Sequence, residues 1–262
     1  MTSKEQDPDN WDRHWATFGD AAEGNPANVY RRHLILKLLG QPEVGAVLLD
    51  IGSGQGEFAI AFKSLHPEVE VWGVEYSALG VMRSRAAAES AAVNLNILQR
   101  NLLNPVHLAD DQPAATYAVC SETLEHVEDP RRLMRHAISL LAPGARVVVT
   151  VPGGPRSAFD RHIGHWRHFD APSLRRVLTD AGLEVEQVLR AGFPGFNVYK
   201  LAVLVRGKKL IRDLESRPNG AEPPRLEAIA NAIFGRVFQI NLDDFPLGWQ
   251  LVAVGHVPDA SV

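Results

Sequence analysis

The sequence predicts an α/β protein whose mostly parallel sheet is covered by helices on both faces. Short apolar runs alternate with segments of helical periodicity along most of the 262 residues, as repeated strand–helix–strand units require. A glycine-rich turn joins the first apolar run, Val47 to Leu49, to a helical pattern that begins near Phe58. A chain of this length fits one sizeable domain, or one domain with an insertion.

Each expected strand is a short apolar run between polar or glycine-rich turns. In chain order the strands are expected at 47–49, 69–74, 95–99, 116–120, 145–151, 183–189 and 248–255. The starts of the intervening helices are indicated by the capping residues Asn25, Ser77, Asp129 and Asp170. Residues 191–246 form an insertion before the last strand, with helical patterns over 198–214 and 226–238.

Bulk composition excludes several classes of protein. Hydrophobic residues make up 45% and charged residues 22%, which is ordinary for a globular protein with a normal core. The net charge of −4 gives no general attraction to nucleic acid. Cys120 is the single cysteine, so no internal disulfide can form, and a reducing, cytoplasmic location is expected. The first ten residues do not resemble a secretory signal, and no apolar run approaches the roughly 20 residues that span a bilayer.

The first 24 residues are expected to form a polar tail followed by a short helix. Trp11, Trp15 and Phe18 recur there at roughly helical spacing. Two interpretations are equally compatible with this spacing: an amphipathic helix that packs on the domain, or a lid over the active site.

A ligand cradle is predicted where the first strand ends. Asp50-Ile51-Gly52-Ser53-Gly54-Gln55-Gly56 places three glycines at alternate positions between a strand and a helix. Glycine permits the tight turn and lets a ligand approach the backbone, and the helix start offers free N–H groups. Glu75 ends the second strand, nineteen residues after Gly56, where a carboxylate would bind a ribose diol. The glycine spacing differs from the G-x-G-x-x-G of dinucleotide-binding proteins.

Three segments together resemble the class I S-adenosylmethionine-dependent methyltransferases, in particular the small-molecule enzymes similar to ubiquinone-pathway O-methyltransferases. The segments are the glycine loop, Gly73-Val74-Glu75-Tyr76-Ser77, and Glu122-Thr123-Leu124-Glu125-His126. The resemblance implies a Rossmann-like sheet of seven strands with an antiparallel last strand. It assigns residues 25–262 to the methyltransferase domain, with 191–246 as a helical insertion that shapes the acceptor pocket, and 1–24 to a tail and possible lid.

The resemblance also implies S-adenosylmethionine as the cofactor. Asn101 stands where relatives usually carry an aspartate near the adenine amino group, and its amide oxygen offers the same acceptor without the charge. Arg31 would meet the carboxylate of the methionine moiety. The expected cofactor-binding residues are Arg31, Asp50, Gly52, Ser53, Gly54, Gly56, Glu75, Tyr76, Asn101, Leu102 and Ser121.

Histidines in two segments are candidates for a general base. The segment 161–170, after the fifth strand, resembles the Gly-His-x-Arg-x-Phe element that lies beside the substrate in relatives. The catalytic candidates are His165, His168 and His126. We favour His165, because Gly164 frees the neighbouring backbone to approach a ligand. An imidazole suits this role because its ordinary pKa, about 6.5, lies near operating pH.

Glu122, Glu125 and His126 also have the donor chemistry to hold Mg²⁺ or Zn²⁺ with a further histidine. Similar clusters bind metal in certain small-RNA 2′-O-methyltransferases and in ubiquinone-pathway enzymes. The same residue types are common in proteins where no metal binds. In that case Glu125 and His126 would stabilise their loop by hydrogen bonds. We therefore expect no metal at this site.

The predicted function is transfer of a methyl group to a small-molecule acceptor, with a hydroxyl oxygen favoured because a histidine can remove its proton. Two alternatives stay open: a metal-dependent nucleic-acid 2′-O-methyltransferase, and a non-catalytic partner subunit with the same fold. No nucleic-acid partner is expected, and no oligomeric state is predicted. The basic helix at 198–214 could contact a membrane surface, although packing on its own domain is the favoured interpretation.

Overall fold

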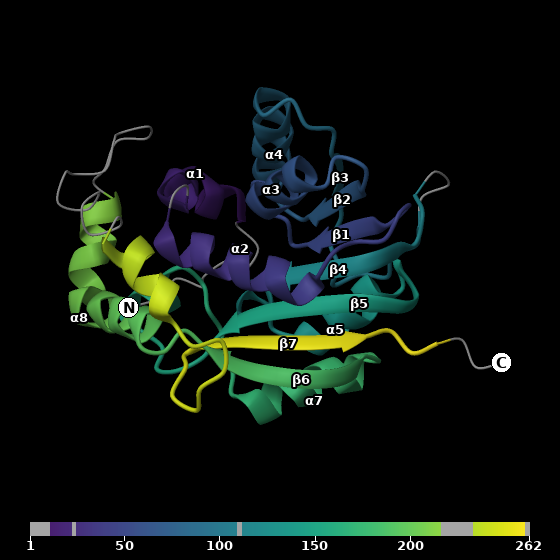
Figure 1. Cartoon of the computed structure of the whole chain (residues 1–262). Helices are drawn as coiled ribbons and strands as arrows, with labels where there is room; N and C mark the ends of the chain where they lie inside the picture. Colours follow the sequence, from purple (N-terminus) through teal and green to yellow (C-terminus); the bar gives the residue numbers. More distant parts are fainter. Residues whose placement is uncertain (1–10, 23–24, 109–111, 216–232, 260–262) are drawn as a thin grey trace.

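A single sheet organises the molecule (Figure 1). The computed structural model describes residues 11–22, 25–108, 112–215 and 233–259. In this part of the chain seven strands lie in the order β3-β2-β1-β4-β5-β7-β6. They are β1 (Val47–Ile51), β2 (Glu70–Glu75), β3 (Asn96–Gln99), β4 (Ala115–Ser121), β5 (Leu141–Pro152), β6 (Glu184–Ala191) and β7 (Gln250–His256). β7 pairs antiparallel with β5 and β6, and the other pairs are parallel, so the predicted fold class is confirmed.

Helices cover both faces of this sheet. The helices described are α1 (Trp11–Ala22), α2 (Pro26–Leu39), α3 (Glu57–Leu65), α4 (Ala78–Ser90), α5 (Pro130–Ile138), α6 (Ala158–His162), α7 (Ala171–Ala181) and α8 (Gly195–Glu215), with short 3-10 helices η1 (Leu124–His126) and η2 (Phe238–Ile240). α2 and α3 pack with Leu48 and Val148 on one face, while α5 and α7 pack with Leu49 and Val149 on the other. Burial on both faces explains why the central strands are continuous apolar runs.

The helix starts predicted from capping residues are confirmed. The Asn25 side chain accepts a hydrogen bond from Ala27 N at 2.9 Å, and Asp129 accepts one from Arg132 N at 3.0 Å. Ser77 and Asp170 cap α4 and α7 in the same way. Each cap satisfies a backbone donor that the first helical turn leaves free, which fixes where the helix begins.

Three segments differ from the sequence prediction. α5 ends at Ile138, and β5 already begins at Leu141, because Leu141 pairs with Ala115 of β4; the turn expected at Pro143-Gly144 lies inside β5 as an irregularity, where Gly144 has a φ of 73°. A short helix, α6, occupies the start of the expected loop 161–170, held by a capping box between Ser157 and Asp160. α8 is longer than expected and contains non-helical backbone at Gly207.

Two predictions fall partly or wholly outside the described residues. The polar tail, residues 1–9, lies outside them. Of the helix expected over 226–238, residues 233–237 are described and are helical. None of the helices in the described part of the chain is long and apolar enough to cross a membrane.

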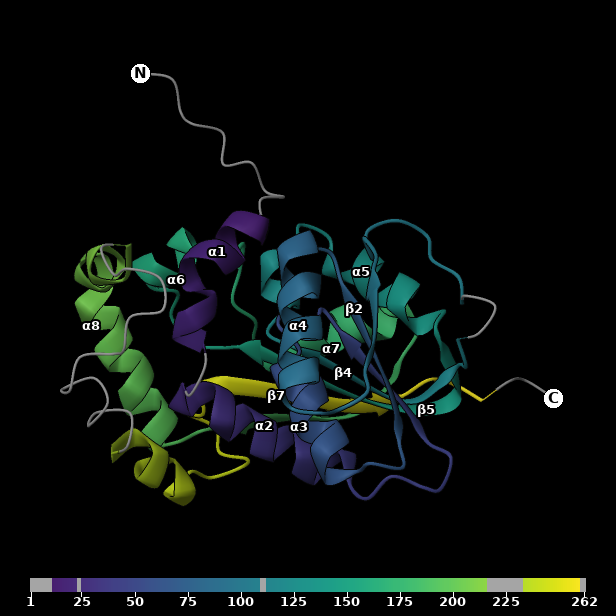
Figure 2. The ribbon, with the colours of Figure 1, turned by 90° about the horizontal axis from the view of Figure 1, so that it is seen from above.

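α1 and α8 extend beyond the sheet on the side where the parallel strands end (Figure 1). Seen from above, α1 lies between α8 and α4, and it contacts both (Figure 2). The loops that follow β1, β2 and β4 open on this same side, beneath α1. The fold therefore gathers the polar loop residues into a region that two helices cover.

The packing of α7 leads to a stability prediction. Leu174 is fully buried between α7 and the sheet, so Leu174→Ala should lower the free energy of unfolding by about 2–5 kcal/mol. The control is Leu65→Ala at the end of α3, where the residue is 60% exposed and the change should stay within about 0.5 kcal/mol. Urea titration followed by circular dichroism measures both. Equal losses in the two variants would contradict the assignment of Leu174 to the core.

Candidate functional site

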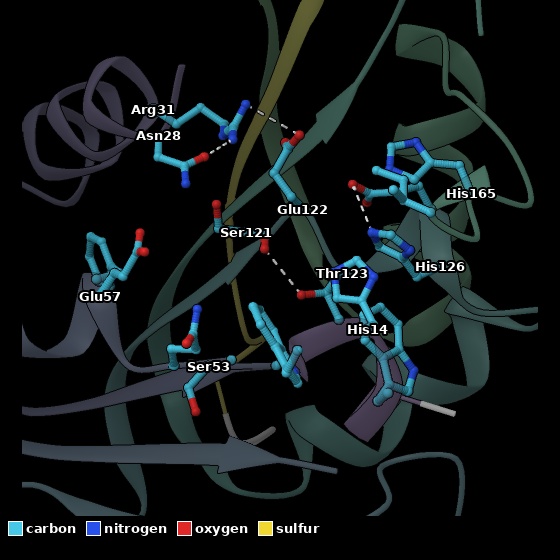
Figure 3. Close-up of a pocket in the computed structure, with 18 of the residues that line it drawn as sticks. His14, Asn28, Arg31, Ser53, Glu57, Ser121, Glu122, Thr123, His126 and His165 are labelled. Atoms are coloured by element: carbon cyan, nitrogen blue, oxygen red, sulfur yellow. Dashed lines mark hydrogen bonds and ion pairs between the residues drawn. The ribbon is translucent and has the colours of Figure 1, made fainter. Parts of the chain in front are cut away.

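A cavity of about 910 Å³ opens at the carboxyl edge of the sheet. Its lining comes from the loops after β1, β2 and β4 and from helices α1, α2, α6 and α8. Pockets for small ligands and cofactors commonly have volumes of about 300–1,000 Å³. Of the residues predicted to bind the cofactor, all except Gly56 line this cavity. Figure 3 shows several of them, together with His126 and His165.

The glycine loop after β1 forms one wall. Gly52 and Gly54 have φ angles of 69° and 55°, in the left-handed region that favours glycine. A Cβ on Gly52 would lie 2.6 Å from Thr123 Oγ1, and one on Gly54 would lie 2.8 Å from the Trp15 ring. Gly56 instead closes the turn, with its N–H donating to Ser53 O at 2.8 Å. Thr123 and the Trp15 ring therefore approach the loop closely only because positions 52 and 54 are glycine.

Glu75 connects the first two loops. Its Oε2 accepts a hydrogen bond from Gly54 N, and its Oε1 accepts one from Ser77 N, both at 2.8 Å. Burial raises the pKa of Glu75, and these two backbone donors oppose the rise. Burial and the charge of Glu75 also raise the pKa of Asp50 to about 7. Two carboxyl groups thus lie under the cradle, with the Glu75 oxygens directed at its rim.

α1 covers this part of the cavity. The Trp15 ring lies over Gly54, and its Nε1 sits beside the Glu75 carboxylate without a hydrogen bond of ordinary geometry. Asp12 accepts hydrogen bonds from Ser77 Oγ and, at 3.0 Å, from Leu79 N. Gln55 donates to Gly19 O at 2.9 Å. These contacts pack α1 against the cradle, and a role as a lid stays a prediction.

Arg31 and Glu122 form an ion pair at another wall, with Arg31 Nη1 3.5 Å from Glu122 Oε2 (Figure 3). Glu122 Oε1 also accepts hydrogen bonds from Thr150 Oγ1 at 3.2 Å and Gln250 Nε2 at 2.9 Å. Arg31 additionally donates to Asn28 Oδ1. Arg31 therefore lines the cavity as predicted, but its charge is already partly balanced by Glu122.

The remaining predicted cofactor residues occupy the side of the cavity near β3 and β4. Leu102 is buried, and Tyr76 is 39% exposed. The Asn101 Oδ1 accepts a hydrogen bond from Leu103 N at 2.9 Å, and its second lone pair stays available to a ligand. Ser121 Oγ pairs with Thr150 Oγ1 at 2.9 Å. These contacts hold an apolar slot with polar groups at its edges.

The candidate base residues separate into two kinds. His126 and His165 line the cavity, with ring centroids 4.5 Å apart. His168 lies behind His165 and does not line it; its Nε2 is 3.2 Å from His165 Nδ1. His14 of α1 joins the cavity wall near His126, at a centroid distance of 6.1 Å. His162 is exposed on α6, away from the cavity lining.

The histidines of the cavity are neutral. Burial lowers the pKa of His165 to about 3 and that of His14 to about 4. Burial, together with the neighbouring His165, lowers the pKa of His126 well below its ordinary value. The ordinary value of about 6.5 that we expected for a base is therefore corrected downward, because these rings are shielded from water. Their lone pairs are available at neutral pH.

Glu125 is the most unusual group in the cavity. It is fully buried, and within the described residues neither of its carboxylate oxygens has a hydrogen-bond partner. Its Oε1 lies 4.0 Å from His126 Nε2. Burial raises the pKa of Glu125 well above its ordinary value, and the charge of Glu122 adds to the rise. Within the described residues His126 Nδ1 also has no hydrogen-bond partner of ordinary geometry, although the backbone groups of Glu125 and His126 bond to Trp166 and Thr123.

This orphaned carboxyl group bears on the expected absence of a metal. One ligand atom from each of Glu125, His126 and His165 lies within 4.8 Å of the others. One carboxylate and two imidazoles suit Zn²⁺ and other first-row transition metals. The donor set thus fits a divalent cation, and the expectation that none binds stays a prediction.

Sequence reasoning missed Lys200 and Asp160, which form an ion pair at 3.1 Å in the cavity wall. Lys200 lies on α8, inside the insertion, and Asp160 lies on α6. Burial raises the pKa of Asp160, but Lys200 and the hydrogen bonds from Ser157 outweigh it and hold the pKa at about 2. The Ser-x-x-Asp spacing of the capping box is a local signal for Asp160, whereas no local pattern predicts Lys200.

Comparison with known proteins agrees with this geometry. A family described as "Methyltransferase domain" matches residues 27–188. A protein named ubiquinone biosynthesis O-methyltransferase from Xanthomonas campestris is 28% identical over 192 residues, which is 67% of this chain and 77% of the relative. A protein of the same name from Cronobacter sakazakii is 31% identical over 136 residues, which is 52% of this chain and 54% of the relative.

Solved structures share the fold at low sequence identity. The cyclase SpnF superposes with a TM-score of 0.63 at 14% identity, covering 97% of each chain. Geranyl diphosphate C-methyltransferase from Streptomyces coelicolor, crystallised with Mg²⁺, geranyl diphosphate and S-adenosyl-L-homocysteine, superposes at 0.57 with 16% identity, covering 92% of this chain and 84% of that one. With the family match over most of the domain, the chain belongs to the methyltransferase domain family and is a class I S-adenosylmethionine-dependent methyltransferase.

Proposed function

We propose that this enzyme transfers a methyl group to a hydroxyl oxygen of a small-molecule acceptor, in the cytoplasm. The single observation that carries the proposal is a neutral histidine, His165, in the wall of a cavity whose other end is the cofactor cradle. The names of the Xanthomonas and Cronobacter relatives support oxygen as the atom that is methylated. The net charge of −4 supports a small acceptor rather than a nucleic acid.

The residues of the cradle fit S-adenosylmethionine. Gly52 and Gly54 add no side chain of their own to the cradle, whose Gly54 end is covered by Trp15 of α1, and Glu75 directs a buried carboxylate at the rim. A carboxylate at the end of the second strand is the group that accepts hydrogen bonds from a ribose diol. When bound, the cofactor supplies an electrophilic methyl group on a positively charged sulfur. The protein's task is then to align the acceptor oxygen with that methyl group and to exclude water.

His165 would take the proton of the acceptor hydroxyl. An oxygen that is gaining a methyl group becomes strongly acidic, so even a weakly basic neutral imidazole can accept its proton. The pKa of about 3 keeps the ring in the base form before the reaction. The ring carries a positive charge afterwards, and the carboxylate of Asp160 is close enough to favour that charge.

The acceptor half of the cavity is largely apolar. Its lining includes Phe159 of α6 and Ile163 just after it, together with Tyr199, Val203 and Leu210 of α8. Apolar walls with few polar groups are typical of pockets for small organic molecules. They favour an acceptor with an aromatic or aliphatic body that carries the reacting hydroxyl. Tight binding of RNA with a steep salt dependence would instead favour the nucleic-acid alternative.

The function is tested directly by turnover of S-adenosylmethionine against a panel of hydroxylated apolar compounds, with mass spectrometry of the products. Addition of one methyl group to an oxygen is the expected result. Methylation only at carbon or nitrogen would contradict the choice of oxygen. Binding of the cofactor without turnover of any hydroxylated compound in the panel would favour the partner-subunit alternative.

Substitutions in the cradle should weaken cofactor binding. Gly54→Val places a branched side chain in the cradle and should abolish binding. Glu75→Gln removes the charge from hydrogen bonds worth about 1.5–3 kcal/mol and should raise Kd about tenfold or more. Glu68→Gln is the matched control, because its side chain is 58% exposed outside the cavity. Calorimetry measures each affinity; wild-type affinity in Glu75→Gln would refute the assignment.

Removal of the base should affect the chemical step rather than cofactor binding. His165→Ala should lower kcat by about 10²–10⁴-fold, with cofactor affinity near that of the wild type. The control is His162→Ala. His162 is exposed and lies three residues before His165, so this substitution should leave kcat unchanged. Both are measured with a saturating acceptor. Near-normal kcat in His165→Ala would show that alignment alone drives the reaction or that another group is the base.

A second candidate follows from the two unpartnered oxygens of Glu125. In it Glu125, His126 and His165 would hold a divalent cation, which could bind the acceptor oxygen and lower the pKa of its hydroxyl. This candidate predicts one metal per chain by elemental analysis and loss of activity on chelation. The sequence-based expectation predicts no metal and no effect of the chelator. Glu125→Gln would remove the metal without altering the cradle residues.

A further inference from the structure

The Gly154 carbonyl, His168 and His165 form a chain of contacts that ends at the cavity wall. His168 Nδ1 lies 3.1 Å from the backbone oxygen of Gly154. On its other edge, His168 Nε2 lies 3.2 Å from His165 Nδ1. His165 lines the cavity, whereas His168 does not, and the His168 side chain is only 6% exposed. The two rings therefore connect a fixed backbone carbonyl to the cavity.

The carbonyl of Gly154 sets the direction in which hydrogen bonds are donated along this series of contacts. A carbonyl oxygen can only accept, so His168 Nδ1 must carry a proton and donate it. The His168 side chain is buried, and the carboxylate of Asp160 lies 3.7 Å away, beyond a hydrogen bond, so a charged ring would have no ion-pair partner at hydrogen-bond distance among the described residues; the ring is therefore neutral and its Nε2 carries no proton. A bare Nε2 can only accept, so the nearby Nδ1 of His165 must carry a proton and donate it. A neutral His165 with a proton on Nδ1 has a free lone pair on Nε2.

The charged groups around the pair do not reverse this polarity. Asp160 Oδ2 lies 3.7 Å from His168 Nε2, beyond a hydrogen bond. Its carboxylate is already engaged by Lys200 at 3.1 Å and by Ser157 N at 2.6 Å. Asp160 therefore does not need a protonated His168 as its partner. The structure shows no hydrogen bond to His165 Nε2 from the described residues, which leaves this atom open to a ligand.

We infer that His168 is a positioning residue that holds His165 in its Nδ1–H tautomer and so presents the Nε2 lone pair of His165 to the acceptor. The catalytic consequence rests on the proposed role of His165 as the base, but the tautomer itself does not. It reassigns His168, which the sequence suggested as a base, to a supporting role behind the reacting ring. If His165 held a cation through Nε2, the tautomer would be the same, but Nε2 could then not act as the base.

The proton balance of the step follows from this arrangement. As the oxygen–methyl bond forms and the sulfur–methyl bond breaks, the acceptor O–H bond breaks and an N–H bond forms at His165 Nε2. His165 then carries protons on both nitrogens and still donates from Nδ1 to His168. The positive charge that began on sulfur ends on the imidazole, close to Asp160. In the opposite tautomer Nε2 would already carry a proton, and the ring could not act.

The tautomer can be measured without any assay of activity. Long-range ¹H–¹⁵N correlation spectra of the whole protein, labelled with ¹⁵N-histidine, distinguish a protonated from a bare ring nitrogen. The His165→Gln variant identifies the His165 signals by their disappearance, and His168→Gln does the same for His168. We expect both rings to be neutral, with the proton on Nδ1. An Nε2–H tautomer of His165 in the wild-type protein would overturn the inference.

Two substitutions at position 168 test the cause. His168→Phe removes the acceptor for His165 Nδ1–H, so His165 should change to the Nε2–H tautomer and kcat should fall by about 10²-fold or more, with cofactor affinity unchanged. His168→Gln places an amide oxygen near the position of Nε2 and should restore both the tautomer and most of kcat. His162→Phe is the control for an added aromatic ring on an exposed site of α6.

The outcomes separate this inference from the proposed function. An unchanged His165 tautomer in His168→Phe would refute the role of His168, whatever the activity. A changed tautomer with normal kcat would refute the role of His165 as the base and, with it, the catalytic part of the inference. Heteronuclear spectra of the backbone establish that each variant is folded before either result is interpreted.

Discussion

The carboxylate of Glu75, shared between the backbone N–H groups of Gly54 and Ser77, is the interaction on which the rest of the site depends. It connects the loop after β1 to the start of α4, and it can do so only because β1 and β2 are neighbours in parallel register. Ser77 in turn caps α4 and binds Asp12 of α1. One buried carboxyl group thus fixes the cradle, the helix behind it and the helix that covers it.

Much of this architecture is encoded locally and could be predicted. Caps at Asn25, Asp129 and Asp170 each satisfy a backbone donor within three residues, so their effect needs no distant partner. Apolar runs between such caps become central strands because both faces of the sheet are covered. The rule that ligands bind at the carboxyl edge of a parallel sheet then brought together Glu75 at the end of β2 with Ser121 and His126 at and after the end of β4, and all of them line one cavity.

What could not be predicted depends on contacts between distant segments. The sequence favours His165 through its neighbour Gly164, but nothing in it shows that the fold puts His165 in the cavity wall and His168 behind it. The low pKa of His165 arises from its burial in the folded chain, which the sequence does not show, so an ordinary value was expected. Lys200 reaches Asp160 across forty positions of sequence, from an insertion whose fold has no strong local signal. The start of β5 at Leu141 likewise comes from a distant contact, the pairing of Leu141 with Ala115 of β4, and the proline–glycine turn is kept as an irregularity inside the strand.

α1 touches both halves of the cavity, and this has a thermodynamic consequence. Trp15 lies on Gly54 beside Glu75, while Trp11 and His14 pack against His126 with ring centroids 4.8 Å and 6.1 Å away. A ligand at either end that shifts this helix must work against the same set of contacts. The first ligand to bind would then bear the free-energy cost of moving α1 away from the cavity, and the second ligand would bind to a cavity from which α1 has already moved. The cofactor and the methyl acceptor would therefore each increase the affinity of the protein for the other by the same factor, without direct contact between them, because linkage between two sites is reciprocal.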